Sequence, residues 1–227
     1  MSREIRVSED PAAEVAERLT EAAVAGGHVV LTGGSSPKAA YQLAAERDAD
    51  WSGATVWFTD ERCVPPADPD SNFGMADRAL LSQLSAGPSV VRMEGELGPD
   101  AGAGNYEAAV RERLGSDPRW NLLLLGMGPD GHTASLFPGK PEVEERSRLA
   151  VAVPLAGMDP QVPRISLSLP ALGAAREAIL LITGENKADT VARVFGPSPD
   201  RSLPAAQVEL PYGTLTVLLD EAAASRL

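Results

Sequence analysis

Cysteine, histidine and aromatic residues are all scarce in this chain of 227 residues. The single cysteine, Cys63, excludes a disulfide framework and is consistent with a reducing, cytoplasmic location. Two histidines and one cysteine without paired spacing give no metal-binding signature, so we expect no metal. Of the two histidines, His28 begins an apolar run and is expected to be structural. His132 is therefore the histidine expected to take part in catalysis. With aromatic residues at 4%, the core must be mainly Val, Leu, Ile and Ala.

Long apolar segments are missing as well. No run approaches the roughly 20 apolar residues that a membrane-spanning helix requires, and residues 1–6 are not followed by the apolar stretch of a secretory signal. The 20 Lys and Arg are outnumbered by 32 Asp and Glu, for a formal net charge of −12. Such a field repels nucleic acids and anionic membranes, so we expect neither as a partner, and an anionic ligand needs local cations. A monomer and a small homo-oligomer both remain open.

Apolar runs alternate with amphipathic segments along the chain. Strands are expected at residues 28–32, 54–59, 121–125, 149–153, 164–169, 178–183 and 214–219. Helices are expected from Pro11 to the Gly26-Gly27 pair, at 37–47, 72–84, 103–114 and 187–194, and after Asp220. This order predicts an α/β fold in which one domain, residues 1–227, contains an open, mainly parallel sheet with helices on both faces. Ligands of such sheets bind beyond the carboxyl ends of the strands.

A turn rich in glycine and serine, Gly33-Gly34-Ser35-Ser36, follows the first of these strands and precedes a helix. Glycines let backbone N–H groups converge on an anion, the hydroxyls add donors, and the helix N-terminus contributes positive potential. A phosphate site is therefore one interpretation. The other is a plain strand-to-helix turn in which Ser36 is the N-cap.

Three charged residues, Asp60, Glu61 and Arg62, follow the next strand. Charged groups at the carboxyl end of a strand are unfavourable to bury but useful for holding a polar substrate. A surface ion-pair cluster is the alternative interpretation.

The most distinctive segment contains Gly126, Gly128 and Gly131 after a strand, with the GxGxxG spacing of dinucleotide sites. We reject that cofactor, because Asp130 would face the pyrophosphate and no acidic residue ends the next strand to hold a ribose. What remains is a turn that presents Asp130 and His132 at the mouth of the sheet. Histidine is the side chain best suited to proton transfer near neutral pH.

Two cations stand out in so acidic a chain: Arg164 at a strand start and Lys187 at a helix start. Helix starts favour acidic residues, so the position of Lys187 indicates a functional reason. A guanidinium fork and an ammonium point charge both suit a phosphate group. Spacing alone does not place the two in one pocket.

Together these loops resemble the 6-phosphogluconolactonase family over most of the chain. The matching segments are LTGGSSP at 31–37, WFTDERCV at 57–64, SNFG at 71–74, LGMGPDGHTASLFP at 125–138, RISLSLPAL at 164–172 and GENKA at 184–188. The resemblance implies the open α/β fold shared with glucosamine-6-phosphate deaminases and ribose-5-phosphate isomerases. It also implies hydrolysis of the small-molecule substrate 6-phospho-D-glucono-1,5-lactone in the oxidative pentose phosphate pathway, without a cofactor.

The residues agree with that chemistry, because an activated cyclic ester needs a base, an oxyanion site and an anchor, but no covalent nucleophile. His132 would deprotonate a water that attacks the carbonyl and then return the proton to the ring oxygen. Arg62 and the N–H groups of turn 126–131 are candidates to stabilise the oxyanion. Asp130 or Asp60 would orient the imidazole or the sugar hydroxyls. The residues expected to hold the substrate and its phosphate are Gly33, Gly34, Ser35, Ser36, Asn72, Arg164 and Lys187.

Two other functions fit the same pattern. A sugar-phosphate isomerase or deaminase would use Asp60 to abstract a substrate proton, although Arg62 and the Asp130-Gly131-His132 turn favour the lactonase. A non-catalytic sugar-phosphate effector domain would normally accompany a DNA-binding domain, and no basic extension precedes the first predicted helix.

Overall fold

The computed structural model describes residues 2–227, and its centre is a seven-stranded sheet in which every neighbouring pair is parallel. The strand order is β1-β10-β9-β6-β2-β3-β5. In chain order these strands are β1 (Ser2–Val7), β2 (Gly27–Leu31), β3 (Ala54–Phe58), β5 (Ser89–Val90), β6 (Trp120–Gly126), β9 (Ala175–Ile182) and β10 (Thr214–Leu219).

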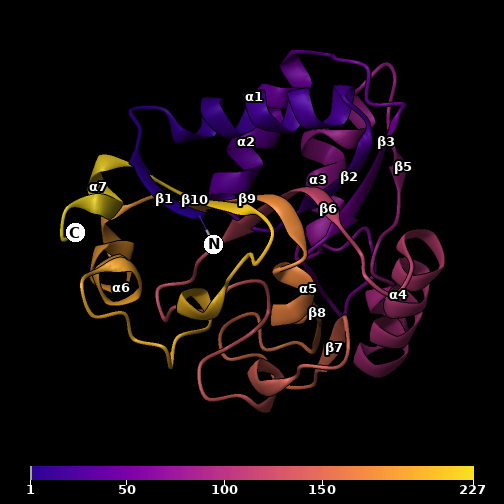
Figure 1. Ribbon diagram of the computed structural model, residues 1–227. Coiled ribbons are helices and arrows are strands. Elements are labelled where there is room, and N and C mark those ends of the chain that lie inside the picture. The colour runs from indigo at the N-terminus through magenta and orange to yellow at the C-terminus, as the bar shows by residue number, and fades with distance from the viewer. Residues whose placement is uncertain (1) are drawn as a thin grey trace.

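Helices cover both faces of this sheet, as predicted (Figure 1). Above it in Figure 1 lie α1 (Pro11–Val24) and α2 (Ser35–Glu46), which share one core cluster with α3 (Asn72–Ala79). The helices α4 (Pro99–Leu114), α5 (Leu169–Leu172), α6 (Ala188–Phe195) and α7 (Glu221–Ala224) belong to the core cluster of the other face. Across residues 2–227, no helix combines the length and the apolar character needed to cross a membrane.

The run of four leucines in β6 shows why the strands are continuously apolar. Leu122 and Leu124 pack with α1 to α3, whereas Leu123 and Leu125 pack into the core on the opposite face. Successive side chains of a strand point to opposite faces, so a strand covered on both sides is apolar at every position. The pattern therefore predicted the parallel sheet correctly.

A second, antiparallel sheet was not expected. It has the order β4-β8-β7 and contains β4 (Asp60–Arg62), β8 (Arg164–Leu167) and β7 (Ala150–Val153). Two of these segments were predicted as strands, but the prediction of a mainly parallel sheet did not separate them from the parallel strands. Their length explains this, because runs of three or four residues carry too little pattern to indicate a partner.

Several boundaries also differ from the prediction. The edge strands β1 and β5 were missed, because β1 contains only two apolar residues, Ile5 and Val7, and β5 is only two residues long. The helix expected at 72–84 ends at Ala79, since Leu80 leaves the helical conformation. The strand expected at 164–169 ends at Leu167, where the Ser168 side chain caps α5 by accepting from the Ala171 N–H.

His28 has the structural role expected of it. At the amino end of β2, its Nδ1 accepts a hydrogen bond of 3.0 Å from Trp57 Nε1. Burial, with a smaller effect of Arg113, lowers the pKa of His28 and so favours the neutral ring that can accept this bond.

Two buried tyrosine hydroxyls take the place of strand partners at the carboxyl ends of β2 and β3. In a parallel strand, every second residue points its backbone N–H and C=O toward the same neighbouring strand. The N–H and C=O of Phe58 therefore point to the side of β3 on which β5 lies, but β5 is too short to pair with them. The Tyr106 hydroxyl accepts from the Phe58 N–H at 2.8 Å and donates to the Phe58 carbonyl at 2.9 Å. The Tyr41 hydroxyl does the same for Thr32, at 2.9 and 2.8 Å.

Tyr106→Phe should lower the free energy of unfolding by about 1–3 kcal/mol, because it leaves a buried N–H and a buried carbonyl unpaired. Urea denaturation would measure the change. Tyr212→Phe is the control, since that side chain is 77% exposed, and it should alter stability by no more than about 0.5 kcal/mol. Equal stability of the two variants would contradict the proposed role of the Tyr106 hydroxyl.

Candidate functional site

A cavity of about 390 Å³ opens at the carboxyl ends of the central strands. Along the chain, the sheet continues from β2 to β3 on one side and from β6 to β9 on the other, so β2 and β6 flank its topological switch point. Their register ends at Val30 and Leu123, before either strand ends. Open α/β sheets bind ligands at such a crevice. Every predicted site residue except Asp130 lines the cavity.

The Gly33 to Ser36 turn forms one wall. Helix α2 begins at Ser35 with Gly34 as its N-cap, so the alternative in which Ser36 caps the helix is wrong. Gly34 has a φ of 115° and contributes no side-chain cap, which leaves the first helix amides open toward the cavity. The Ser36 hydroxyl lies 2.6 Å from that of Thr183, which follows β9. The turn therefore has the donors and the helix potential of an anion site.

His132 lines the cavity and forms a close pair with Asp130. Asp130 Oδ1 lies 2.6 Å from His132 Nδ1 and also accepts from the His132 backbone N–H at 3.2 Å. A carboxylate at Nδ1 places the proton on that nitrogen and leaves Nε2 as the acceptor. Burial raises the pKa of Asp130, but the contacts with His132 outweigh burial and lower it. Gly128 allows this packing, since a Cβ there would lie 2.1 Å from the imidazole.

Asp60 is held differently. It is 5% exposed and accepts from the Ser135 hydroxyl at 2.7 Å and from the Thr59 hydroxyl at 2.8 Å, one at each oxygen. Of the two carboxylates that the sequence left open, the structure thus places Asp130 against His132. Ser135 was missed by sequence reasoning, because nothing in its neighbours reveals a partner 75 residues away.

Arg62 and Arg164 face each other across β4 and β8, where they are direct register partners. Arg164 is 2% exposed, and its Nη2 donates long hydrogen bonds to the carbonyls of Met158 and Pro160, at 3.3 and 3.2 Å. Within residues 2–227, the buried Nε of each arginine has no partner. Burial and Arg62 lower the pKa of Arg164, while Asp60 raises it. Like charges directly opposite each other are unfavourable, so this pair is suited to an anion.

Lys187 reaches the same cavity from the start of α6. Its Nζ donates to the Met127 carbonyl at 2.7 Å. Burial lowers the pKa of this ammonium, and the nearby Asp130 carboxylate partly opposes the effect. The structure thus brings Lys187 and Arg164 to one pocket, which spacing could not establish.

Two backbone N–H groups of the 126–131 turn, which the sequence suggested as oxyanion donors, already have hydrogen-bond partners within or next to the turn. Gly128 N–H donates to the His132 carbonyl at 2.9 Å, and Gly131 N–H donates to the Gly128 carbonyl at 3.1 Å. These two groups close the turn on itself, which removes them as oxyanion donors, while Arg62 lines the cavity as a further candidate.

Cys63 follows Arg62 but does not line the cavity. It is partly buried against the core, and burial, with a smaller effect of Glu61, raises the pKa of its thiol to about 11. A protonated thiol outside the cavity does not act as a nucleophile there.

Comparisons with known proteins agree on one family. The profile described as glucosamine-6-phosphate isomerases/6-phosphogluconolactonase matches residues 3–217. A 6-phosphogluconolactonase of Streptomyces coelicolor is 40% identical over 97% of this chain and 90% of its own. The structure of 6-phosphogluconolactonase from Trypanosoma cruzi is similar with a TM-score of 0.87 and 28% identity, over 100% of this chain and 98% of that one. A monomeric glucosamine-6-phosphate deaminase, at 18% identity and a TM-score of 0.83 over the whole of both chains, shares the fold.

Gly128→Ala should push the imidazole away from Asp130, because the new Cβ would overlap the ring of His132. Gly126→Ala is the matched control, since a Cβ there meets nothing within 4 Å. Histidine side-chain ¹H–¹⁵N NMR should lose the signal of the hydrogen-bonded Nδ1 proton in Gly128→Ala only. Both variants should keep the circular dichroism of the parent, and an unchanged His132 signal in Gly128→Ala would contradict this packing.

Proposed function

The chain belongs to the glucosamine-6-phosphate isomerase/6-phosphogluconolactonase family, and on that premise we propose how its cavity performs the lactonase reaction. It is an enzyme that hydrolyses 6-phospho-D-glucono-1,5-lactone to 6-phospho-D-gluconate in the oxidative pentose phosphate pathway. The observation that carries the mechanism is the Asp130–His132 pair, 2.6 Å apart, beside a cavity lined with cations.

His132 is the general base. Its Nδ1–H is held by Asp130, so Nε2 is the nitrogen that accepts a proton from water. The water oxygen bonds to the lactone carbonyl carbon while the imidazole becomes protonated, and Asp130 stabilises the imidazolium. Collapse of the tetrahedral intermediate breaks the bond to the ring oxygen, which takes the proton back from Nε2. The net change is addition of one water, and the new acid ionises to 6-phosphogluconate.

Arg62 stabilises the negative charge that develops on the carbonyl oxygen. Its Nη1 donates to the Asp70 carbonyl at 2.5 Å, which restrains the guanidinium at the cavity while its other N–H groups remain to act as donors. Asp60, whose two oxygens accept from hydroxyls, orients the sugar hydroxyls and neighbouring cations instead of acting as a base. In a deaminase, Asp60 would instead abstract a substrate proton.

The 6-phosphate is held by the turn 33–36, Lys187 and Arg164. The turn supplies open helix amides and hydroxyls, and the two cations supply charge at positions where burial strengthens an ionic contact. Asn72 lines the cavity beside this turn and contributes to substrate binding.

His132→Asn should reduce kcat by roughly 10²- to 10⁴-fold while product affinity is retained, because asparagine can hydrogen-bond but cannot accept the proton of water. The measurement is the loss of freshly generated lactone with enzyme and with buffer alone, since the lactone also hydrolyses spontaneously. Near-native turnover of this variant would remove His132 from the mechanism.

Lys187→Ala and Arg164→Ala should each lower kcat/KM by roughly one to two powers of ten, because a charge-assisted hydrogen bond contributes about 1.5–3 kcal/mol. Unphosphorylated glucono-1,5-lactone is the control substrate, which the parent and both variants should process equally slowly. If a folded variant loses activity equally on both lactones, that residue acts at the carbonyl and the phosphate assignment is wrong.

A further inference from the structure

Glu61 is a buried carboxylate that the mechanism above does not use. It is 3% exposed, and its two oxygens accept four hydrogen bonds. Oε1 accepts from the backbone N–H groups of Arg62 and Asn72, both at 2.7 Å. Oε2 accepts from the Ser71 hydroxyl at 2.9 Å and from the Phe73 N–H at 2.8 Å. Two carboxylate oxygens offer about four acceptor sites, so the group is fully satisfied.

The four donors belong to two different elements. Asn72 and Phe73 are the first residues of α3, and their N–H groups have no partner within the helix. Ser71, the N-cap, accepts from the Gly74 N–H at 3.0 Å, and Glu61 takes the amides that the cap does not reach. Glu61 therefore joins the N-terminus of α3 to β4, and the helix potential there favours a negative charge.

The hydrogen bonds of Glu61 fix the backbones of two residues that line the cavity, Arg62 and Asn72. Arg62 N–H and Asn72 N–H share one oxygen of Glu61, so the backbones of both residues are tied to one point. The Asn72 amide then donates to the Asp60 carbonyl at 2.9 Å. Its Oδ1 lies so close to Gly33 that a Cβ on Gly33 would be 2.0 Å away. A displacement of Asn72 would therefore also disturb the 33–36 turn, which the Asn72 side chain contacts at Gly33.

We propose that Glu61 is a positioning residue for the lactonase reaction, which sets Arg62 and Asn72 against the substrate without touching it. The proposal rests on the function proposed above for those two residues. All four partners of Glu61 act as donors, so only the carboxylate satisfies them together. Burial raises the pKa of Glu61, and the four hydrogen bonds oppose that rise.

The test is Glu61→Gln in two backgrounds. Glutamine keeps the shape but replaces one acceptor oxygen with an NH₂ group that faces donors, so Arg62 and Asn72 lose their common anchor. In the parent we expect kcat/KM on the phosphorylated lactone to fall by about 10- to 100-fold. In an Arg62→Ala/Asn72→Ala background the same change should lower it by less than about threefold, because nothing remains to be positioned.

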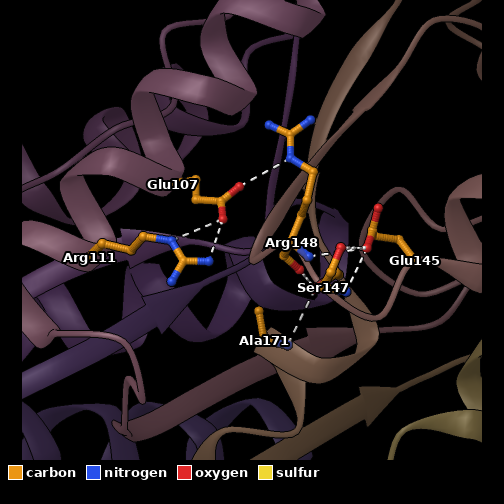
Figure 2. A network of polar contacts seen from close by, with 7 residues as sticks. Glu107, Arg111, Glu145, Ser147, Arg148 and Ala171 are labelled. Carbon is orange, nitrogen blue, oxygen red and sulfur yellow. Dashed lines mark hydrogen bonds and ion pairs between the residues drawn. The ribbon is translucent and has the colours of Figure 1, made fainter.

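Glu107→Gln is the matched control. Glu107 also accepts several hydrogen bonds, from Arg111 Nε and Nη2 at 3.1 and 2.7 Å and from Arg148 Nε at 3.2 Å (Figure 2). It does not line the cavity. Glu107→Gln should lower the Tm with kcat/KM unchanged. If Glu61→Gln does not fold, Ser71→Ala, which removes one donor to Glu61, should show a smaller loss with the same dependence on background.

Three results would overturn the inference. One is parent-like kcat/KM in folded Glu61→Gln, and another is an equal loss in both backgrounds, which would indicate a general effect on folding. If Arg62→Ala/Asn72→Ala itself keeps the kinetics of the parent, the roles proposed for Arg62 and Asn72 fail together with this inference. The first two results leave those roles intact, so the two failures are distinguishable.

Discussion

The early end of the β2–β6 register is the constraint on which the site depends. Two parallel strands that stop pairing before they end leave backbone groups without partners, and such groups must be satisfied elsewhere when they are buried. At the end of β2 the Tyr41 hydroxyl satisfies both backbone groups of Thr32. The crevice that remains is lined by residues from both halves of the chain, including the short strands β4 and β8, the starts of α2 and α3, and the loops that follow β2 and β6.

Local charge, and not the net charge, decides what this crevice attracts. The chain carries a formal charge of −12, yet Arg62, Arg164, Lys187 and the N-terminus of α2 all line one cavity. Burial weakens the screening of these cations by water. An anionic sugar phosphate is therefore favoured inside the cavity, although the surface as a whole repels anions.

The carboxylates near the cavity differ in role because they differ in partners. Asp130 contacts the imidazole of His132, whereas Asp60 accepts from two hydroxyls and is held in place. Glu61 accepts from four donors and has no further site to offer a substrate. Adjacent acids in the sequence, Asp60 and Glu61, thus face different surroundings, because successive residues of a strand point to opposite sides.

The sequence by itself determined the α/β class, the parallel strands and the loops that carry the chemistry, because apolar periodicity and glycine-rich turns are local properties. It also indicated His132, since only two histidines exist and one begins a strand. It could not show that Asp130, and not Asp60, contacts His132. It also could not show that Arg164 and Lys187 line the same cavity. It could not reveal that Ser135 holds Asp60 or that Glu61 anchors α3. Those contacts join segments that are far apart in the chain, or depend on which face of a short strand a side chain occupies, and only the tertiary structure sets them.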